Sequence, residues 1–126
     1  MPTPIEIVTR FIALWEGPGG FRSAVEAYFT PYTVWENHGL LTTTGRDEAL
    51  SFFEQFAGSS GMTGMKVDML ALAAVGDKVL TERIDRGFDK DGNETIKVPV
   101  MGIFEIADGR IMAWRDYFDT ASFSQE

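Results

Sequence analysis

The second half of the chain alternates apolar and polar residues almost without a break, and this pattern constrains the fold more than any other feature of the sequence. Four such runs follow one another: MKVDMLALAAV, KVLTERIDRGF, ETIKVPVMGIFEI and RIMAWRDYF. Period-two alternation is typical of strands with one buried face. The turn residues between the runs favour hairpins. We therefore predict an antiparallel meander over residues 65–118.

The first half of the chain carries helical spacing instead. Thr3 is a candidate N-cap, with Pro4 at the first helical position and Glu6 three residues after the cap. Two shorter helices are predicted at FRSAVEAYF and RDEALSFFEQF, the latter with Leu50, Phe53 and Phe56 as its buried stripe. GSSGMTG indicates a flexible loop and YTVWEN a fifth strand. This order predicts one α+β domain over residues 1–126, with about three helices packed on one face of a curved antiparallel or mixed sheet.

Composition and charge exclude several classes of function. Nineteen acidic and eleven basic residues give a net charge of −8, so the protein repels phosphate backbones and anionic membranes and we expect no nucleic-acid partner. With no cysteine and one histidine, disulfides and multi-histidine metal cages are excluded. No apolar run suits a membrane span, and the N-terminus lacks a signal-peptide core. We expect an unprocessed cytoplasmic protein without a metal site.

An aspartate stands in the middle of an otherwise apolar strand face. Alternate residues of a strand share a face, and here that face consists of Met112, Trp114, Asp116 and Phe118. Burying an ionised carboxylate is costly unless another group compensates its charge. Asp116 is therefore expected to have a partner.

The strand VLTERIDRGF offers that partner, because Arg83 and Asp85 share one of its faces. If the sheet curls so that this face meets Asp116, one guanidinium lies between two carboxylates in an apolar hollow. A single arginine compensates only one negative charge, so one carboxylate is expected to keep a proton. A protonated acid beside an ionised base is the arrangement that general acid–base catalysis requires.

Simpler interpretations of this strand remain open. Most neighbouring Arg–Asp pairs are surface pairs of little energetic value. The register can also be inverted, which would place Leu80, Ile84 and Phe88 inward and leave Arg83 and Asp85 in water.

Other side chains are candidates for the same hollow. Trp35 and Asn37 share a strand face, and the Asn37 amide suits the positioning of a water, although an asparagine at a strand end also satisfies local backbone groups. Met69 and Met112 either line an adaptable pocket or lie in the core. His38 is expected to face solvent.

The segments TERID and VPVMGIFEIADGRIMAWRDYFD closely resemble the C-terminal half of limonene-1,2-epoxide hydrolases, which belong to the nuclear transport factor 2-like superfamily. GRDEA, residues 45–49, is similar to that superfamily's turn into its third helix. The resemblance covers most of the domain. It implies a cone-shaped half-barrel with the helices on the concave side of the sheet.

The resemblance also implies a one-step, cofactor-free hydrolysis of an epoxide to a vicinal diol. By match, Asp116 is the base that deprotonates the attacking water, Asp85 is the acid that protonates the epoxide oxygen, and Arg83 bridges them. Asn37 matches an asparagine that positions the water, and Trp114 matches a tryptophan at the site.

One departure from the family precedes Asn37. Where the family has Tyr-His-Asn, this chain has Trp35-Glu36-Asn37, and an indole can only donate a hydrogen bond. The implied partners are water and a small or medium apolar epoxide. The expected pocket residues are Trp35, Trp114, Met69, Met112 and Phe118.

Two other classes of function are compatible with the sequence. Isomerases and cyclases of the ketosteroid isomerase and polyketide cyclase type share the implied fold, including a variant that opens an epoxide with the substrate's own hydroxyl. A non-catalytic ligand-binding or dimerisation module is the third hypothesis. The family commonly dimerises through an outer sheet surface, where Leu80, Ile84 and Phe88 are expected, so a homodimer is predicted.

Overall fold

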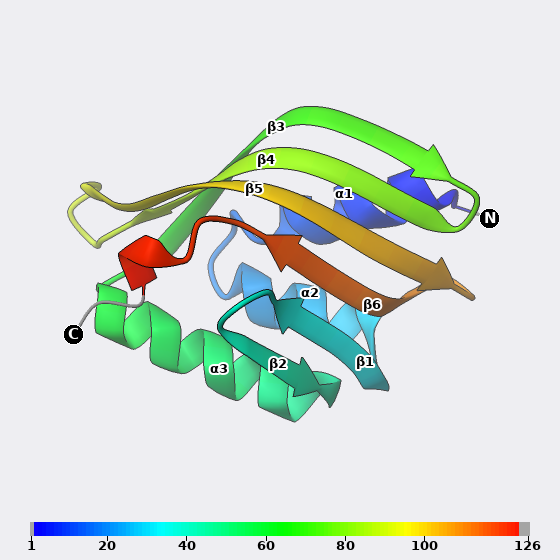
Figure 1. The fold of residues 1–126 in the computed structure, drawn as a ribbon. Coiled ribbons are helices and arrows are strands. Elements are labelled where there is room, and N and C mark those ends of the chain that lie inside the picture. The colour runs from blue at the N-terminus through cyan, green and yellow to red at the C-terminus, as the bar shows by residue number, and fades with distance from the viewer. Residues whose placement is uncertain (1, 124–126) are drawn as a thin grey trace.

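The computed structural model describes residues 2–123, which form a curved mixed sheet with three helices on its concave side (Figure 1). The elements are α1 (Pro4–Leu14), α2 (Gly20–Tyr28), β1 (Phe29–Asn37), β2 (Leu41–Thr44), α3 (Gly45–Ser60), β3 (Gly64–Val75), β4 (Lys78–Phe88), β5 (Glu94–Ala107), β6 (Arg110–Tyr117) and the 3₁₀-helix η1 (Ala121–Phe123). No helix in this part of the chain is long and apolar enough to cross a membrane.

The sheet has the strand order β2-β1-β6-β5-β4-β3. The predicted meander is confirmed, because β3 to β6 pair with one another in sequence and antiparallel. β1 lies parallel to β6 and makes the sheet mixed. The hairpin partner β2 was not predicted, since four residues of sequence LTTT carry no clear alternation of apolar and polar side chains.

The first helix begins as the sequence predicts. The Thr3 hydroxyl accepts a hydrogen bond from the Glu6 amide at 3.2 Å, while the Thr3 amide donates to the Glu6 carboxylate at 2.8 Å. These two bonds satisfy backbone donors that a helix start leaves free. The capped helix packs against the sheet, and the core between them comprises Ile7, Val8, Phe11, Ile12, Trp15, Phe21, Ala24, Val25, Phe29, Val79, Phe104, Ile111 and Trp114.

The segment GSSGMTG is not the flexible loop that its composition indicates. Helix α3 continues through Gly58 to Ser60 and ends where Gly61 adopts φ 74°. A left-handed residue after the last turn is a common helix end, and glycine adopts it without steric cost. The helix is thereby long enough to face β1 and to form one wall of the interior.

A β-bulge in β6 overturns the prediction that Met112 points inward. Glu105 pairs with Ala113, but Ile106 pairs with Ile111, so Met112 is the extra residue of β6. A bulge breaks the strict alternation of faces. Ile111 is therefore fully buried and Met112 is 39% exposed, whereas Trp114 and Asp116 keep the predicted inward direction.

Candidate active site

The guanidinium of Arg83 lies between the carboxylates of Asp85 and Asp116. It donates to Asp85 from Nη2 at 2.8 Å and from Nε at 3.0 Å. It donates to Asp116 from Nη2 at 3.0 Å and from Nη1 at 3.2 Å. Arg83 is completely buried, so the surface-pair interpretation and the inverted register of β4 are wrong. The outward Leu80, at 39% exposure, agrees with this register.

The two carboxylates differ in their access to solvent. The side chain of Asp116 is 6% exposed and that of Asp85 is 21% exposed. Asp116 also accepts a hydrogen bond from the indole Nε1 of Trp114 at 2.7 Å. Asp85 is therefore the more exposed of the two acids. Asp116 is almost completely buried and accepts hydrogen bonds from three donors on two side chains.

Burial and charge act in opposite directions on these groups. Burial raises the pKa of Asp116 above its ordinary value, although the charge and hydrogen bonds of Arg83 and the Trp114 donor work against that shift. Burial alone would lower the pKa of Arg83, but the charges and hydrogen bonds of Asp116 and Asp85 outweigh it and raise that pKa. Arg83 therefore stays charged, and Asp116 is a stronger base than an exposed aspartate.

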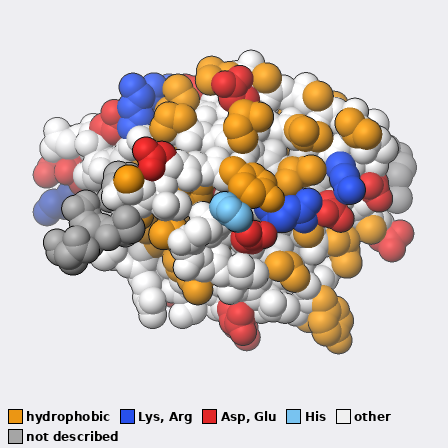
Figure 2. Space-filling view, viewed as in Figure 1, with side chains coloured by type: hydrophobic (Ala, Val, Ile, Leu, Met, Phe, Trp, Pro, Cys, Tyr) orange, Lys and Arg blue, Asp and Glu red, His pale blue; other side chains and the backbone are white. Residues whose placement is uncertain are grey.

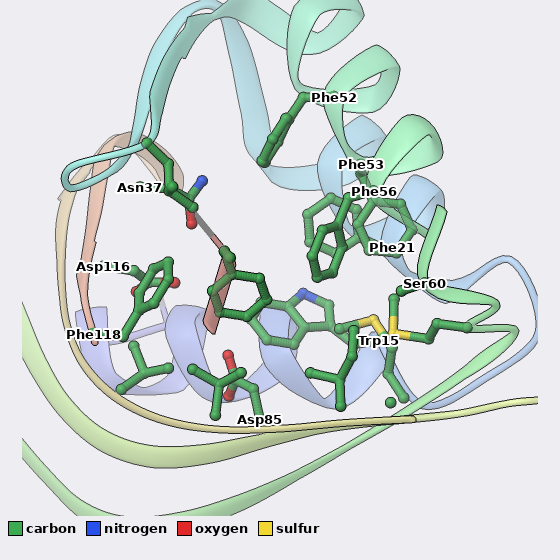
Figure 3. A pocket seen from close by; sticks show the side chains of 18 of the residues that line it. Trp15, Phe21, Asn37, Phe52, Phe53, Phe56, Ser60, Asp85, Asp116 and Phe118 are labelled. Carbon is green, nitrogen blue, oxygen red and sulfur yellow. The ribbon is translucent and has the colours of Figure 1, made fainter. Parts of the chain in front are cut away.

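A cavity of about 890 Å³ opens over this triad (Figure 3). Asp85 and Asp116 line it from the sheet, and the side chain of Asn37 is directed into it. Aromatic rings form much of the remaining wall. They belong to Trp15, Phe21, Trp35, Phe52, Phe53, Phe56, Trp114, Phe118 and Phe123.

Asn37 lies beside Asp116 because β1 and β6 are neighbours. The two residues are register partners of the parallel pair. Asn37 is only 8% exposed, and its side-chain amide makes no hydrogen bond to the described residues. Because this amide faces the cavity, its donors and acceptor are free to hold a small polar molecule there.

The indole of Trp35 stacks on that of Trp114, with ring centroids 4.6 Å apart and planes 10° apart. Phe104 stacks on Trp114 at 5.2 Å. These contacts fix the ring whose Nε1 holds Asp116. The Nε1 of Trp35 itself is buried without a partner among the described residues, so Trp35 contributes a flat apolar surface to the cavity.

Two of the residues expected in the pocket do not line it. Met112 is turned outward by the bulge in β6. Met69 lies opposite Arg83 on β3, but β3 is the edge strand and a bulge follows at Leu70. Met69 is consequently 36% exposed and is not among the cavity residues. The expectations for Trp35, Trp114 and Phe118 agree with the lining.

Several site residues were not singled out by the sequence. Phe53 and Phe56 were expected as a buried helix stripe, but they face the cavity from α3 (Figure 3). Thr81 contacts the guanidinium, and Gly102 lies where no side chain would fit. A glycine inside a strand pattern signals a close approach and could have identified Gly102.

Neither the histidine nor a cluster of metal-ligating side chains belongs to the described part of this site. His38 faces solvent as predicted, with its ring 2.9 Å from Glu36. Within residues 2–123, no group of three or more His, Asp or Glu side chains is arranged to hold a metal ion.

The curved sheet and the helices on its concave side, with the cavity between them, define an α+β protein of the nuclear transport factor 2-like fold. Residues 2–125 match the family model for the limonene-1,2-epoxide hydrolase catalytic domain. The chain belongs to the limonene-1,2-epoxide hydrolase family.

Individual relatives agree with this assignment. The chain is 35% identical over 95 residues to the epoxide hydrolase EphG of Mycobacterium tuberculosis, covering 75% of this chain and 60% of that protein, so it spans less than two thirds of that relative. A solved LEH-like epoxide hydrolase of M. tuberculosis superposes with a TM-score of 0.75 at 30% identity, covering 93% of this chain and 83% of that one. A SnoaL-like polyketide cyclase from Jannaschia sp. CCS1 has a TM-score of 0.76 at 21% identity, covering 95% and 88%, and shows the fold alone.

Proposed function

We propose that this protein hydrolyses an apolar epoxide to a vicinal diol in one step, with Asp116 as the base, Asp85 as the acid and Arg83 as the bridge between them. The observation that carries the proposal is the single buried guanidinium bonded to both carboxylates at the floor of an aromatic cavity. Family membership makes epoxide hydrolysis the first chemistry to test.

The reaction needs a base and an acid acting at the same moment. Asp116 takes a proton from water while the water oxygen forms a bond to one epoxide carbon. The bond between that carbon and the epoxide oxygen breaks, and Asp85 delivers its proton to this oxygen. One water is added overall, and exchange with solvent returns the proton from Asp116 to Asp85. Arg83 stays charged throughout.

The position of the water follows from the free amide of Asn37. Its oxygen accepts one water proton while Asp116 accepts the other, so the lone pair of the water points into the cavity. Trp35, in place of the family's tyrosine, makes no hydrogen bond to Asp116 and acts in this proposal as part of the apolar wall.

The cavity supports a small or medium apolar substrate. Its volume of about 890 Å³ lies within the range of roughly 300–1,000 Å³ typical of sites for drug-sized ligands. The lining is mainly aromatic and aliphatic, so affinity would come from burial of the hydrocarbon part of the epoxide.

We also propose a homodimer formed through the outer face of the sheet. Apolar side chains are spread over this side of the molecule among charged ones, around the single histidine (Figure 2). Met101 and Tyr117 are register partners with 52% and 42% exposure, and Leu80 is 39% exposed.

A cytoplasmic location and a single domain over residues 1–126 stay predictions from the sequence.

The test is single-turnover hydrolysis in ¹⁸O-labelled water with terpenoid, cyclic and styrene-type epoxides. One label in the diol and none in the protein supports the one-step mechanism, whereas a labelled aspartate contradicts it. An unlabelled cyclic or rearranged product would indicate the cyclase or isomerase class instead. Absence of turnover across the panel would favour a binding module.

Two variants accompany this experiment. Asp85→Asn and Asp116→Asn should each lower kcat/KM by about 100-fold or more, because a positioned acid or base typically contributes that much. Asp68→Asn is the matched control, since Asp68 also pairs with an arginine, Arg86, at 2.8 Å, but is partly exposed and outside the triad. Equal losses in all three variants would contradict the assigned roles.

A further inference from the structure

The contact between Arg83 and Asp116 crosses over a strand. Arg83 is on β4 and Asp116 is on β6, and β5 lies between them. Neighbouring strands are about 4.8 Å apart, so the side chains must span two such spacings. At the crossing point on β5 stands Gly102, which is the register partner of both Thr81 and Asp116.

Gly102 leaves the space that this crossing needs. A Cβ atom at this position would lie 2.4 Å from Oδ1 of Asp116 and 2.5 Å from Nη1 of Arg83. Both distances are far inside van der Waals contact. Gly102 is not among the residues with positive φ, so the requirement for glycine here is one of space and not of backbone conformation.

Thr81 completes the hydrogen bonding of the guanidinium. An arginine side chain has five N–H donors. In Arg83, four N–H groups donate to Asp85 and Asp116. The fifth, the second N–H of Nη1, donates to the Thr81 hydroxyl at 3.0 Å. All five donors therefore have acceptors, although the side chain is completely buried.

The hydrogen bond from the Thr81 hydroxyl to Gly102 determines the direction of the one between Thr81 and Arg83. The Thr81 hydroxyl has one proton, which it donates to the carbonyl oxygen of Gly102 at 3.1 Å. A guanidinium only donates, so the hydroxyl oxygen must accept from Arg83. The chain from Arg83 through Thr81 to the backbone of Gly102 thus ties the rotation of the guanidinium to the central strand of the site.

We propose that Thr81 and Gly102 are positioning residues for the reaction, an inference that rests on the proposed function. Gly102 lets the guanidinium reach Asp116, and Thr81 fixes its rotation so that it pairs with both carboxylates at once. Without the acceptor at Thr81, one buried N–H of the Arg83 guanidinium is left unpaired. The guanidinium then rotates away from its present orientation toward another acceptor. The hydrogen bonds from the guanidinium to Asp116 then change, and because these bonds work against the burial that raises the pKa of Asp116, its titration changes with them.

The decisive variants are Thr81→Val, which keeps the shape but removes the hydroxyl, and Thr81→Ser, which restores it. Thr33→Val is the matched control, because Thr33 is also fully buried and donates to a backbone carbonyl, that of Ile111, but lies outside the site. The measurements are the pH profile of kcat/KM and the midpoint of thermal unfolding.

Thr81→Val should lower kcat/KM by about tenfold, the effect of one unsatisfied buried donor, and should shift the limbs of the pH profile. Thr81→Ser should recover most of the rate and the wild-type profile. Thr33→Val should lose a similar amount of thermal stability with the profile unchanged. A wild-type profile and rate in Thr81→Val would overturn the proposal.

A second readout separates this inference from the proposed function. The aspartate carboxyl groups, labelled with ¹³C, are titrated by NMR without substrate. An altered titration of Asp116 in Thr81→Val but not in Thr33→Val supports the positioning role even if no epoxide is hydrolysed. Unchanged titration curves overturn it even if the wild type is an active hydrolase. Gly102→Ala, where it folds, should change the titration of Asp116 as well, because the added Cβ would meet Asp116 Oδ1 and Arg83 Nη1.

Discussion

Asn37 and Asp116 face the same cavity from neighbouring parallel strands, as register partners of β1 and β6. Their closeness depends on a pairing between segments almost 80 residues apart in the chain. In the proposed reaction, the amide of Asn37 and the carboxylate of Asp116 hydrogen-bond to the same water.

Replacing Asn37 by leucine should therefore remove the positioning of that water without removing the base. We expect kcat/KM to fall by about 100-fold, the loss that misplacement of a reacting group by about 1 Å produces. Steady-state kinetics on the best epoxide of the panel measures this. Asn93→Ala, in the turn between β4 and β5, is the control, and equal activity in Asn37→Leu and wild type would argue against the role.

Trp114→Phe should shift the pH dependence of the reaction. The Trp114 indole donates to Asp116 at 2.7 Å and this bond lowers the pKa of Asp116. Its removal raises that pKa further, so the acid limb of kcat/KM moves to higher pH because the base must be ionised.

Trp35→Phe is the matched control for this shift. The Nε1 of Trp35 has no hydrogen-bond partner among the described residues, so the acid limb should keep its wild-type position. Identical shifts in the Trp114 and Trp35 variants would show that lost stacking, and not the hydrogen bond, moves the limb.

The buried carboxylate of Asp116 should also affect stability. Burial raises its pKa in the folded protein above the value of about 3.9 in the unfolded chain. The folded state therefore keeps a proton that the unfolded state has released, and the free energy of unfolding from this group falls as pH rises through the folded pKa.

Asp116→Asn removes this titration, so the difference in unfolding free energy between variant and wild type should change across that pH interval in favour of the variant. Urea unfolding at a series of pH values from about 4 upward measures it. Parallel pH curves for the two proteins would mean that the pKa of Asp116 is not raised in the folded state.

The outer face of the sheet should control association. Met101 is 52% exposed on the outer face of the sheet. Met101→Asp places a charge in the proposed interface, and burying an unpaired charge is unfavourable. Sedimentation should show a dimer for the wild type and a monomer for this variant. The control is Leu14→Asp, at an exposed apolar residue that ends α1 and lies outside the sheet, and this variant should stay dimeric. A monomeric wild type would refute the interface.

Much of the fold follows from the sequence because alternation and turn residues are local properties of the chain. The alternation in β4 predicted that Arg83 and Asp85 share a face, but left open whether that face points inward. The burial of Asp116 was predicted, since inverting its strand would expose Trp114. The capping residues of α1 likewise act within one turn. The resemblance to a family added the roles of these residues, which periodicity does not contain.

The sequence by itself determined the four strands of the meander, the capped start of the first helix, and that a carboxylate lies on a buried strand face. Only the tertiary structure decided that β1 lies beside β6, that a bulge turns Met112 outward, that α3 closes the cavity with phenylalanines, and that Gly102 stands under the crossing of Arg83. The physical reason is range: periodicity reflects neighbours along one segment, whereas these four features depend on how distant segments pair and on the space between them.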